Sequence, residues 1–235
     1  MIVLAIETST PQTSVAIGTE LEIFGEVTIA GKARQESVAP ALGQLLRWTG
    51  LELSQVDGIG VGVGPGLFTG LRVGVQTAKT LAHVLRVPIV GLGSLDALAH
   101  GVREARRRIA AVIDGRRGEV FFATYRSEPS GVIAESEPVV ATPARLVSEL
   151  EALSGEVLAV GNGAILYHDE IAKLGPRVSF ASPTVAHPRA AGLVELAAAR
   201  LLRADHVPSA DVVPVYLRKS DAEIAWDQRA RGVSA

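Results

Sequence analysis

The sequence predicts an α/β protein made of two related lobes, each a mixed sheet flanked by helices. Short apolar runs typical of strands alternate with longer amphipathic stretches typical of helices. The pattern then starts again after a basic run at 103–108, where an apolar run ending in an acid opens a second series of strands. We therefore expect an N-terminal lobe at 1–105, a C-terminal lobe at 106–218 and a flexible tail at 219–235.

The first half begins with strands and continues with helices and strands in alternation. Three β-type runs separated by polar turns predict the opening strands, at 2–6, 14–18 and 21–28. The runs that follow predict a helix, a strand, a long helix, a strand and a short helix, at 35–49, 58–63, 69–85, 88–92 and 94–103. Gly50 is placed to end the first of these helices, and Ser94 to cap the last one.

The second half repeats the opening order of elements. Strands are predicted at 109–113, 119–125, 132–140 and 157–160. Thr142 and Pro143 form an N-cap and first-turn proline pair, which predicts a helix to about Leu153. The alanine-rich stretch at 189–204 predicts the last strong helix. The chain therefore reads as two copies of one α/β arrangement.

Composition limits the class of protein. With 235 residues, 48% of them hydrophobic, the chain buries one large core or two small ones, which excludes disorder. The 23 basic and 25 acidic side chains give a formal charge of -2, too little to gather nucleic acid without help. The lack of cysteine excludes disulfides, thiolate nucleophiles and cysteine-ligated zinc. No apolar run reaches the roughly 18 to 20 residues of a membrane-spanning helix, and the run after Met1 does not resemble a secretory signal, so we expect a soluble cytoplasmic protein.

A glycine-rich turn precedes the long helix. Glycines recur here at every second position: Gly60, Gly62, Gly64 and Gly66. Such turns cradle phosphate in some proteins, but a dinucleotide fingerprint needs glycine where Thr69 stands, and a P-loop needs a lysine far earlier than Lys79. A tight turn that delivers a helix against a sheet is the favoured interpretation over phosphate binding.

The long helix carries a stripe of small residues that recur every four positions: Gly70, Gly74, Ala78 and Ala82. Such a stripe lets another helix approach closely, although packing within its own lobe is the commoner use. The neighbouring apolar helix at 35–49 favours an intermolecular four-helix bundle. The expected partner-binding residues are Val38, Leu42, Leu45, Leu46, Gly70, Leu71, Gly74, Val75, Ala78, Leu81 and Ala82.

The first strand of each lobe ends in an acid, which is Glu7 in the first lobe and Asp114 in the second. Each carboxylate is placed either to orient a metal or a water between the lobes or to cap a turn, and the sequence leaves both readings open. The histidines show no i, i+4 pair, so no helix-borne metal site is predicted. Arg116, Arg117 and the basic run at 103–108 suit either RNA phosphates or a solvated face, and the near-neutral charge favours the second.

Four segments carry a resemblance to a known family. They are Leu-Ala-Ile-Glu-Thr-Ser-Thr at 4–10, Gly-Pro-Gly-Leu-Phe-Thr-Gly-Leu-Arg-Val-Gly at 64–74, Asp-Gly-Arg-Arg-Gly-Glu-Val-Phe at 114–121 and Pro-Val-Tyr-Leu-Arg at 214–218. In these segments the chain resembles the TsaB family, also called YeaZ. The matches are spread over nearly the whole chain, and the Gly-Pro-Gly-x-Phe-Thr-Gly-x-Arg string is highly specific.

The resemblance implies two ribonuclease-H-like lobes of the actin-like ATPase superfamily. It also implies a subunit of the bacterial machinery that installs threonylcarbamoyl on the adenosine next to the anticodon of tRNAs reading codons that begin with A. The catalytic relative is TsaD, whose metal is held by two helical histidines, and here Ser94 and Leu98 stand at those positions. We therefore expect a non-catalytic partner, a pseudo-enzyme without a metal of its own, that docks TsaD through its helices.

Further partners and cofactors follow from the same resemblance. TsaE is expected to join the complex, tRNA to be bound through the complex, and the chain alone to form a homodimer if its apolar helices stay uncovered. No cofactor is expected on this chain alone, whereas the complex is expected to use ATP and a metal held by TsaD. The candidate nucleotide contacts are Glu7, Thr8, Ser9, Thr10, Asp114, Gly161, Asn162 and Gly163. The alternative functions are a zinc glycoprotease-like metallopeptidase and an ATP-dependent kinase of the actin-like superfamily.

Overall fold

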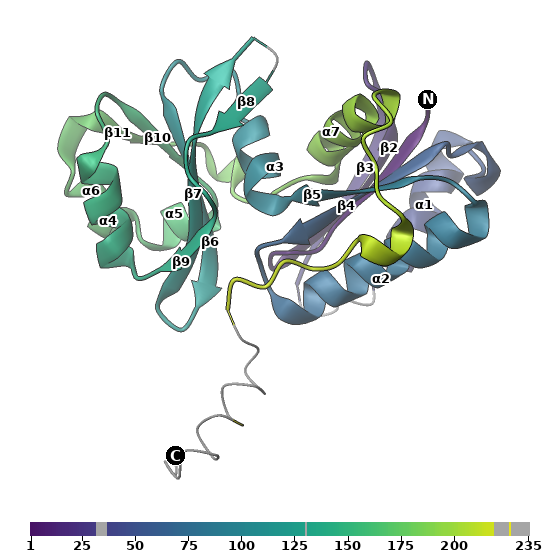
Figure 1. Cartoon of the computed structure of the whole chain (residues 1–235), viewed down its shortest axis with the longest axis horizontal. Coiled ribbons are helices and arrows are strands. Elements are labelled where there is room, and N and C mark those ends of the chain that lie inside the picture. The colour runs from purple at the N-terminus through teal and green to yellow at the C-terminus, as the bar shows by residue number, and fades with distance from the viewer. Residues whose placement is uncertain (32–36, 130, 219–225, 227–235) are drawn as a thin grey trace.

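The computed structural model describes residues 1–31, 37–129, 131–218 and 226, and it contains two sheets of five and six strands (Figure 1). The predicted tail at 219–235 lies outside the described residues except for Trp226, and so does Gln35, the first residue predicted for the first helix. No helix among the described residues has the length and apolar character needed to span a membrane.

The first sheet has the strand order β3-β2-β1-β4-β5. Its strands are β1 (Val3–Glu7), β2 (Gln12–Gly18), β3 (Ile23–Ala30), β4 (Gly58–Gly64) and β5 (Ile89–Gly93). The chain pairs β1 antiparallel with β2 and parallel with β4, so the sheet is mixed. Every residue of β1 is buried, because helices cover both faces at the centre of the sheet.

The second sheet repeats that order as β8-β7-β6-β10-β11, with β9 paired to β7. Its strands are β6 (Arg108–Arg116), β7 (Glu119–Glu128), β8 (Gly131–Ala134), β9 (Val139–Ala141), β10 (Val157–Val160) and β11 (Val178–Phe180). The central strand β6 pairs antiparallel with β7 and parallel with β10, as β1 does with β2 and β4 in the first sheet. The predicted duplication and α/β class are thus confirmed.

Helices flank both sheets. They are α1 (Val38–Thr49), α2 (Phe68–Leu85), α3 (Ser94–His100), α4 (Pro143–Ala152), α5 (Asn162–Leu166), α6 (His168–Ala172) and α7 (Ala190–Leu202). Four single 3-10 turns complete the described elements: Leu53–Gln55, Gly175–Arg177, Pro183–Val185 and Ser209–Asp211. Gly50 ends α1 with left-handed backbone, and the Thr142 hydroxyl accepts from the Arg145 N–H at 3.3 Å, as predicted. Gly93, not Ser94, is the N-cap of α3.

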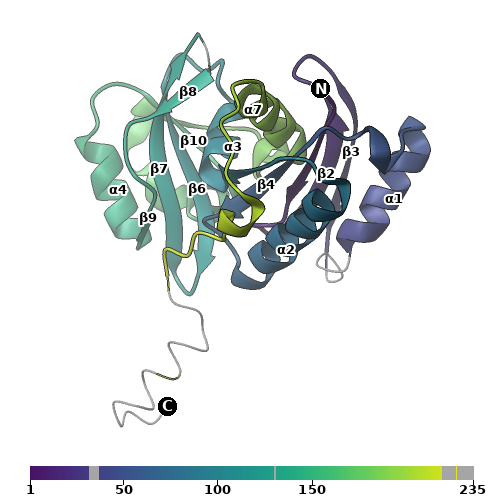
Figure 2. The same ribbon diagram turned by 45° about the vertical axis from the view of Figure 1, so that its right-hand side comes forward.

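The two halves of the chain exchange a helix. The late helix α7 packs its Leu193 and Ala197 on the first sheet, whereas α3 from the first half packs Leu95 and Leu98 on the second sheet (Figures 1 and 2). The predicted boundary at 105/106 falls between the two sheets, but one helix from each side of it packs on the sheet of the other half. Residues 190–202, which the sequence analysis places in the C-terminal lobe, therefore complete the N-terminal sheet.

A strap of chain, residues 205–218, also crosses between the halves and was not predicted. The Lys79 ammonium donates to the Ala210 carbonyl at 3.0 Å and to the Val212 carbonyl at 3.1 Å, which fixes the strap beside α2. The strap then runs to the hairpin between β6 and β7 (Figure 1). There the Arg218 guanidinium pairs with Glu119 at 2.7 Å.

One hydrogen bond across the exchanged helix gives a stability prediction. The Tyr125 hydroxyl on β7 donates to the Asp96 carboxylate on α3 at 2.8 Å, and burial raises the pKa of this phenol. Tyr125→Phe keeps the ring but removes the donor, so we expect the free energy of unfolding to fall by about 1–3 kcal/mol. Urea unfolding curves measure this loss. An unchanged midpoint would contradict a stabilising role for this bond.

Candidate functional site

The loop after β1 is filled by the chain's own side chains. Glu7 is 0% exposed, and its carboxylate accepts from the Ser9 N–H at 2.6 Å and from the Ser94 hydroxyl at 3.2 Å. Burial raises the pKa of Glu7, although the hydrogen bonds from Ser9 and Ser94 act in the opposite direction. Burial therefore favours the protonated form of this acid more than exposure to solvent would.

The rest of this loop lies under α2. The Thr8 hydroxyl donates to the Gly70 carbonyl at 2.7 Å, and Thr10 hydrogen-bonds His187 at 3.1 Å. Thr8, Ser9 and Thr10 are all buried. In this conformation the side chains predicted as nucleotide contacts at the end of β1 and in the loop after it are out of reach of a dissolved nucleotide. Contact with a nucleotide stays a prediction that requires the loop to open.

The glycine-rich turn explains why the loop is closed. The Leu67 N–H donates to the Ser9 carbonyl at 2.7 Å, and a Cβ at Gly66 would clash with the backbone of Ser9. Gly64 has a φ of 107°, which disfavours any residue with a side chain. The turn therefore brings α2 onto the sheet, which supports the favoured interpretation over phosphate binding.

The acid of the second lobe caps a turn. The Asp114 carboxylate accepts from the Arg116 N–H at 2.8 Å, and the Asp114 N–H donates to the Asn162 side-chain oxygen at 3.1 Å. A Cβ at Gly161 would clash with the Val112 carbonyl, and one at Gly163 would lie 2.9 Å from the Ile113 backbone. The structure thus brings Asp114 and the predicted Gly-Asn-Gly motif together, and the two glycines allow close packing on β6.

The predicted partner-binding residues do not form a free surface. Nine of the eleven are buried: Val38, Leu42, Leu45, Gly70, Leu71, Gly74, Val75, Ala78 and Ala82. Leu46 and Leu81 are half-buried against the same core. A Cβ at Gly70 or Gly74 would clash with Thr8, so the small residues let α2 approach its own sheet. The stripe therefore packs within its own lobe, which is the commoner use of such a stripe.

The outer side of the two helices carries other apolar residues, most of which the sequence analysis missed. Val73, Leu81 and Val84 follow one side of α2, with Thr77 completing a spacing of three or four positions, and Val84 is 70% exposed. On α1, Trp48 is 72% exposed. We call Val73, Leu81, Val84 and Trp48 the outer surface; both helices cover the same face of the first sheet (Figures 1 and 2). The sequence does contain a signal for this surface, because Val73, Leu81 and Val84 repeat at helical spacing beside the stripe.

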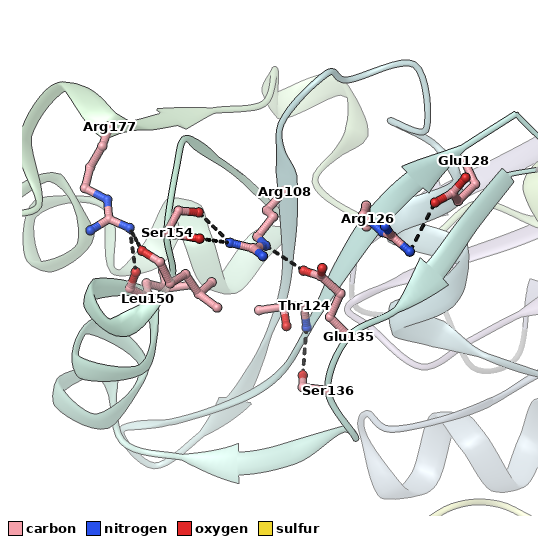
Figure 3. A network of polar contacts seen from close by, with 10 residues as sticks. Arg108, Thr124, Arg126, Glu128, Glu135, Ser136, Leu150, Ser154 and Arg177 are labelled. Atoms are coloured by element: carbon pink, nitrogen blue, oxygen red, sulfur yellow. Dashed lines mark hydrogen bonds and ion pairs between the residues drawn. The ribbon is translucent and has the colours of Figure 1, made fainter.

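Most of the basic run is paired within the chain. Arg108 contacts Glu135 at 2.8 Å and the Ser154 hydroxyl at 2.9 Å (Figure 3). Arg107 pairs with Glu156 at 2.9 Å, and Arg103 with Glu195 at 3.1 Å. These contacts favour the solvated-face interpretation for 103–108. Among the described residues, no three His, Asp or Glu side chains lie close enough together to hold a metal ion.

A different cationic cluster lies where α2, the strap and the β6–β7 hairpin meet. The Arg72 guanidinium stacks over the Phe68 ring, 3.9 Å from its centroid, and its Nε donates to the Tyr216 hydroxyl at 3.2 Å. The Phe68 and Tyr216 rings are 4.7 Å apart. The sequence shows the i, i+4 pair of Phe68 and Arg72, but nothing in it brings Tyr216 to them.

Two sheets of the same strand order that exchange a helix define an α/β protein of the actin-like ATPase fold. Even at 10% identity, the ethanolamine utilization protein EutJ from Carboxydothermus hydrogenoformans has a TM-score of 0.52, covers 83% of this chain and 90% of its own, and shows the fold alone. YeaZ from Pseudomonas aeruginosa has a TM-score of 0.79 at 27% identity, over 92% of this chain and 99% of its own.

Sequence comparisons give the family. A family model described as TsaD, tRNA N6-adenosine threonylcarbamoyltransferase, matches residues 27–226. The tRNA threonylcarbamoyladenosine biosynthesis protein TsaB of Bacillus subtilis is 31% identical over 231 residues, 96% of this chain and 98% of its own. TsaB of Escherichia coli is 28% identical over 229 residues, 96% of this chain and 97% of its own. The chain belongs to the TsaB family.

Proposed function

We propose that this chain is a subunit of the machinery that makes threonylcarbamoyladenosine in tRNA, and that it supports TsaD rather than transferring the group itself. The names of its relatives support the pathway. The observation that carries the non-catalytic role is the packing of α3. Ser94 binds the buried Glu7, and Leu98 lies in the core of the second sheet, at the two positions where the resemblance places the metal-binding histidines of TsaD.

The chemistry of the complex then belongs to TsaD. The Ser94 hydroxyl, which donates to Glu7, and the aliphatic Leu98 side chain do not replace two imidazoles as metal ligands. We infer that this chain alone binds no cofactor, and that ATP and a metal act with TsaD in the assembled complex, which TsaE joins. The tRNA substrate is bound by the complex rather than gathered by the weakly charged chain.

The outer surface is the proposed TsaD contact. It presents Val73, Leu81 and Val84 at helical spacing on α2 and Trp48 on α1, and an amphipathic helix of a partner buries such a surface well. It replaces the small-residue stripe, which is already covered. The same surface is where two copies of this chain would pair when TsaD is absent.

Val84→Glu tests this contact. The side chain is 70% exposed, so a carboxylate there is tolerated in the free chain but is buried against apolar atoms in the complex. We expect TsaD binding to weaken by about 2 kcal/mol or more, roughly 30-fold. Titration calorimetry with purified TsaD measures the affinity. Modification of tRNA by the reconstituted mixture should fall at limiting protein concentrations.

The matched control is Ile133→Glu. Ile133 is 49% exposed on β8, in the second sheet and away from α1 and α2. Its replacement places the same charge on an exposed apolar residue, and TsaD binding should stay at the wild-type level. Normal binding by Val84→Glu would refute the assignment of the outer surface. Threonylcarbamoyl transfer by this chain without TsaD would refute the non-catalytic role.

A further inference from the structure

The strap at 205–218 is held in place by few buried side chains. Nine of its fourteen residues are exposed, and Val212 is the one that is buried. The helix α7, from which the strap continues, has thirteen residues, and six of them are buried. Burial of apolar surface is the main favourable contribution to folding, so the strap gains much less stability from its place in the fold than α7 does.

The Lys79 ammonium on α2 holds the strap next to its buried side chain. It donates to the Ala210 carbonyl at 3.0 Å and to the carbonyl of Val212 itself at 3.1 Å. The first of these bonds is exposed and the second is half-buried, so water replaces the lysine as the donor when the two separate. Polar contacts of this kind keep Val212 in the core without making its release costly.

The backbone of the strap contacts the first sheet at separate points. The Val215 N–H donates to the Val63 carbonyl at 2.7 Å, and Val207 forms an isolated antiparallel bridge with Ile89 on the edge strand β5. These two contacts are eight residues apart, and a 3-10 turn at Ser209–Asp211 lies between them. An added strand would be held by a continuous ladder of hydrogen bonds, whereas isolated contacts can break one after another.

The strap joins the two sheets through a short piece of chain. Val212 packs in the core of the first sheet, and Leu217, five residues later, packs against the core of the second sheet. Five residues span at most about 18 Å, so the strap is a close tie between the two halves (Figures 1 and 2). This tie is separate from the exchange of α3 and α7, which joins the same halves. Release of Val212 would leave the exchanged helices in place.

We propose that the strap opens as a unit, detaching from α2 and the first sheet while the rest of the protein stays folded, and that the Lys79 ammonium holds it closed. Segments with few buried apolar contacts open at a lower free energy than the whole fold. Val213, Val215 and Tyr216 are exposed in the closed strap, so opening adds little apolar surface to water. Opening leaves the exchanged helices as the joint between the halves, so the strap sets how firmly the halves are coupled.

The test uses an introduced thiol, because the chain has no cysteine of its own. Val212→Cys places a small apolar side chain at the buried position of the strap, and its thiol reacts with dithiobis-nitrobenzoate only while the strap is open. Val112→Cys is the matched control, because Val112 is 0% exposed on the central strand β6 of the second sheet. We expect labelling of Val212→Cys to be faster by about 100-fold or more under native conditions.

Further substitutions separate opening of the strap from unfolding of the chain. Tyr125→Phe removes a bond between β7 and α3 that strap opening leaves intact, so it should speed labelling of Val112→Cys and leave that of Val212→Cys unchanged. Lys79→Met keeps the aliphatic stem but removes the donors, so Val212→Cys should be labelled about tenfold faster, which corresponds to the loss of about one net hydrogen bond. Lys79→Arg keeps charged donors and should restore the original rate.

Equal labelling rates for Val212→Cys and Val112→Cys, or an equal effect of Tyr125→Phe on both, would overturn the inference, because the strap would then open only with the whole chain. An unchanged rate in Lys79→Met would show that the lysine does not hold the strap closed. Amide hydrogen exchange followed by NMR gives the same comparison in the chain without substitutions, should a cysteine variant fail to fold. The Val215 N–H should exchange faster than the amides of β6, and exchange as slow as theirs would equally refute the opening.

Discussion

Ala78→Glu should strongly destabilise the fold rather than merely weaken an interface. Ala78 is 0% exposed and lies in the core between α2 and the sheet, where a carboxylate meets no partner. An unpaired buried charge costs about 3–5 kcal/mol, and the added side chain also overpacks the core. Since total stability is about 5–15 kcal/mol, much of it is lost. For a chain of this size the melting temperature should fall by roughly 10–15 °C.

Circular dichroism during heating measures this loss, and Gln76→Glu is the control. Gln76 is exposed two residues earlier on the same helix, so it receives the same charge in water and should melt within about 2 °C of the wild type. A variant at Ala78 that melts normally but no longer binds TsaD would contradict the burial of the stripe. It would return these small residues to the docking surface.

Glu7→Gln should stabilise the protein increasingly as the pH rises. The ordinary pKa of this acid is 4.5, and burial raises it in the folded state. Below 4.5 the acid is protonated whether or not the chain is folded, so wild type and variant differ least there. Between 4.5 and the raised pKa the unfolded chain releases the proton while the folded chain retains it, and the wild type loses stability. Above the raised pKa the difference stays constant.

The size of this effect reports how far burial raises the pKa. Each tenfold change in the acid dissociation constant corresponds to about 1.4 kcal/mol. Thermal melts of both proteins from pH 4 to pH 8 give the difference in stability at each pH. A difference for Glu7→Gln that shrinks as the pH rises would show that the hydrogen bonds from Ser9 and Ser94 outweigh burial.

The sequence predicted the larger elements well, because long apolar periods leave little choice. The predicted strand at 58–63 and helix at 69–85 differ from β4 and α2 by one residue at one end of each. The predicted strand at 132–140 is two strands, β8 and β9, and the elements β11, α5 and α6 were missed. Three to five residues are too few to show a period.

The candidate site was harder to predict, because a pattern identifies the packing face of a helix but not what covers it. The stripe on α2 correctly indicated a close approach, yet the approaching group is Thr8, more than sixty residues away in sequence. Likewise, Glu7 and Asp114 look alike in sequence. Only the structure separates an acid enclosed with Ser94 from one that caps the turn at Arg116.

The exchanged helices also bear on how the chain matures during synthesis. The last strand of the first sheet ends at Gly93, but the helix that covers that sheet's second face begins about 100 residues later, at Ala190. At a ribosomal speed of about 5–20 residues per second, one apolar face of the first sheet stays exposed for on the order of ten seconds before α7 is made. The nascent first half therefore exposes apolar surface of the kind that chaperones bind, and the second face of the first sheet is covered only after α7 has been made.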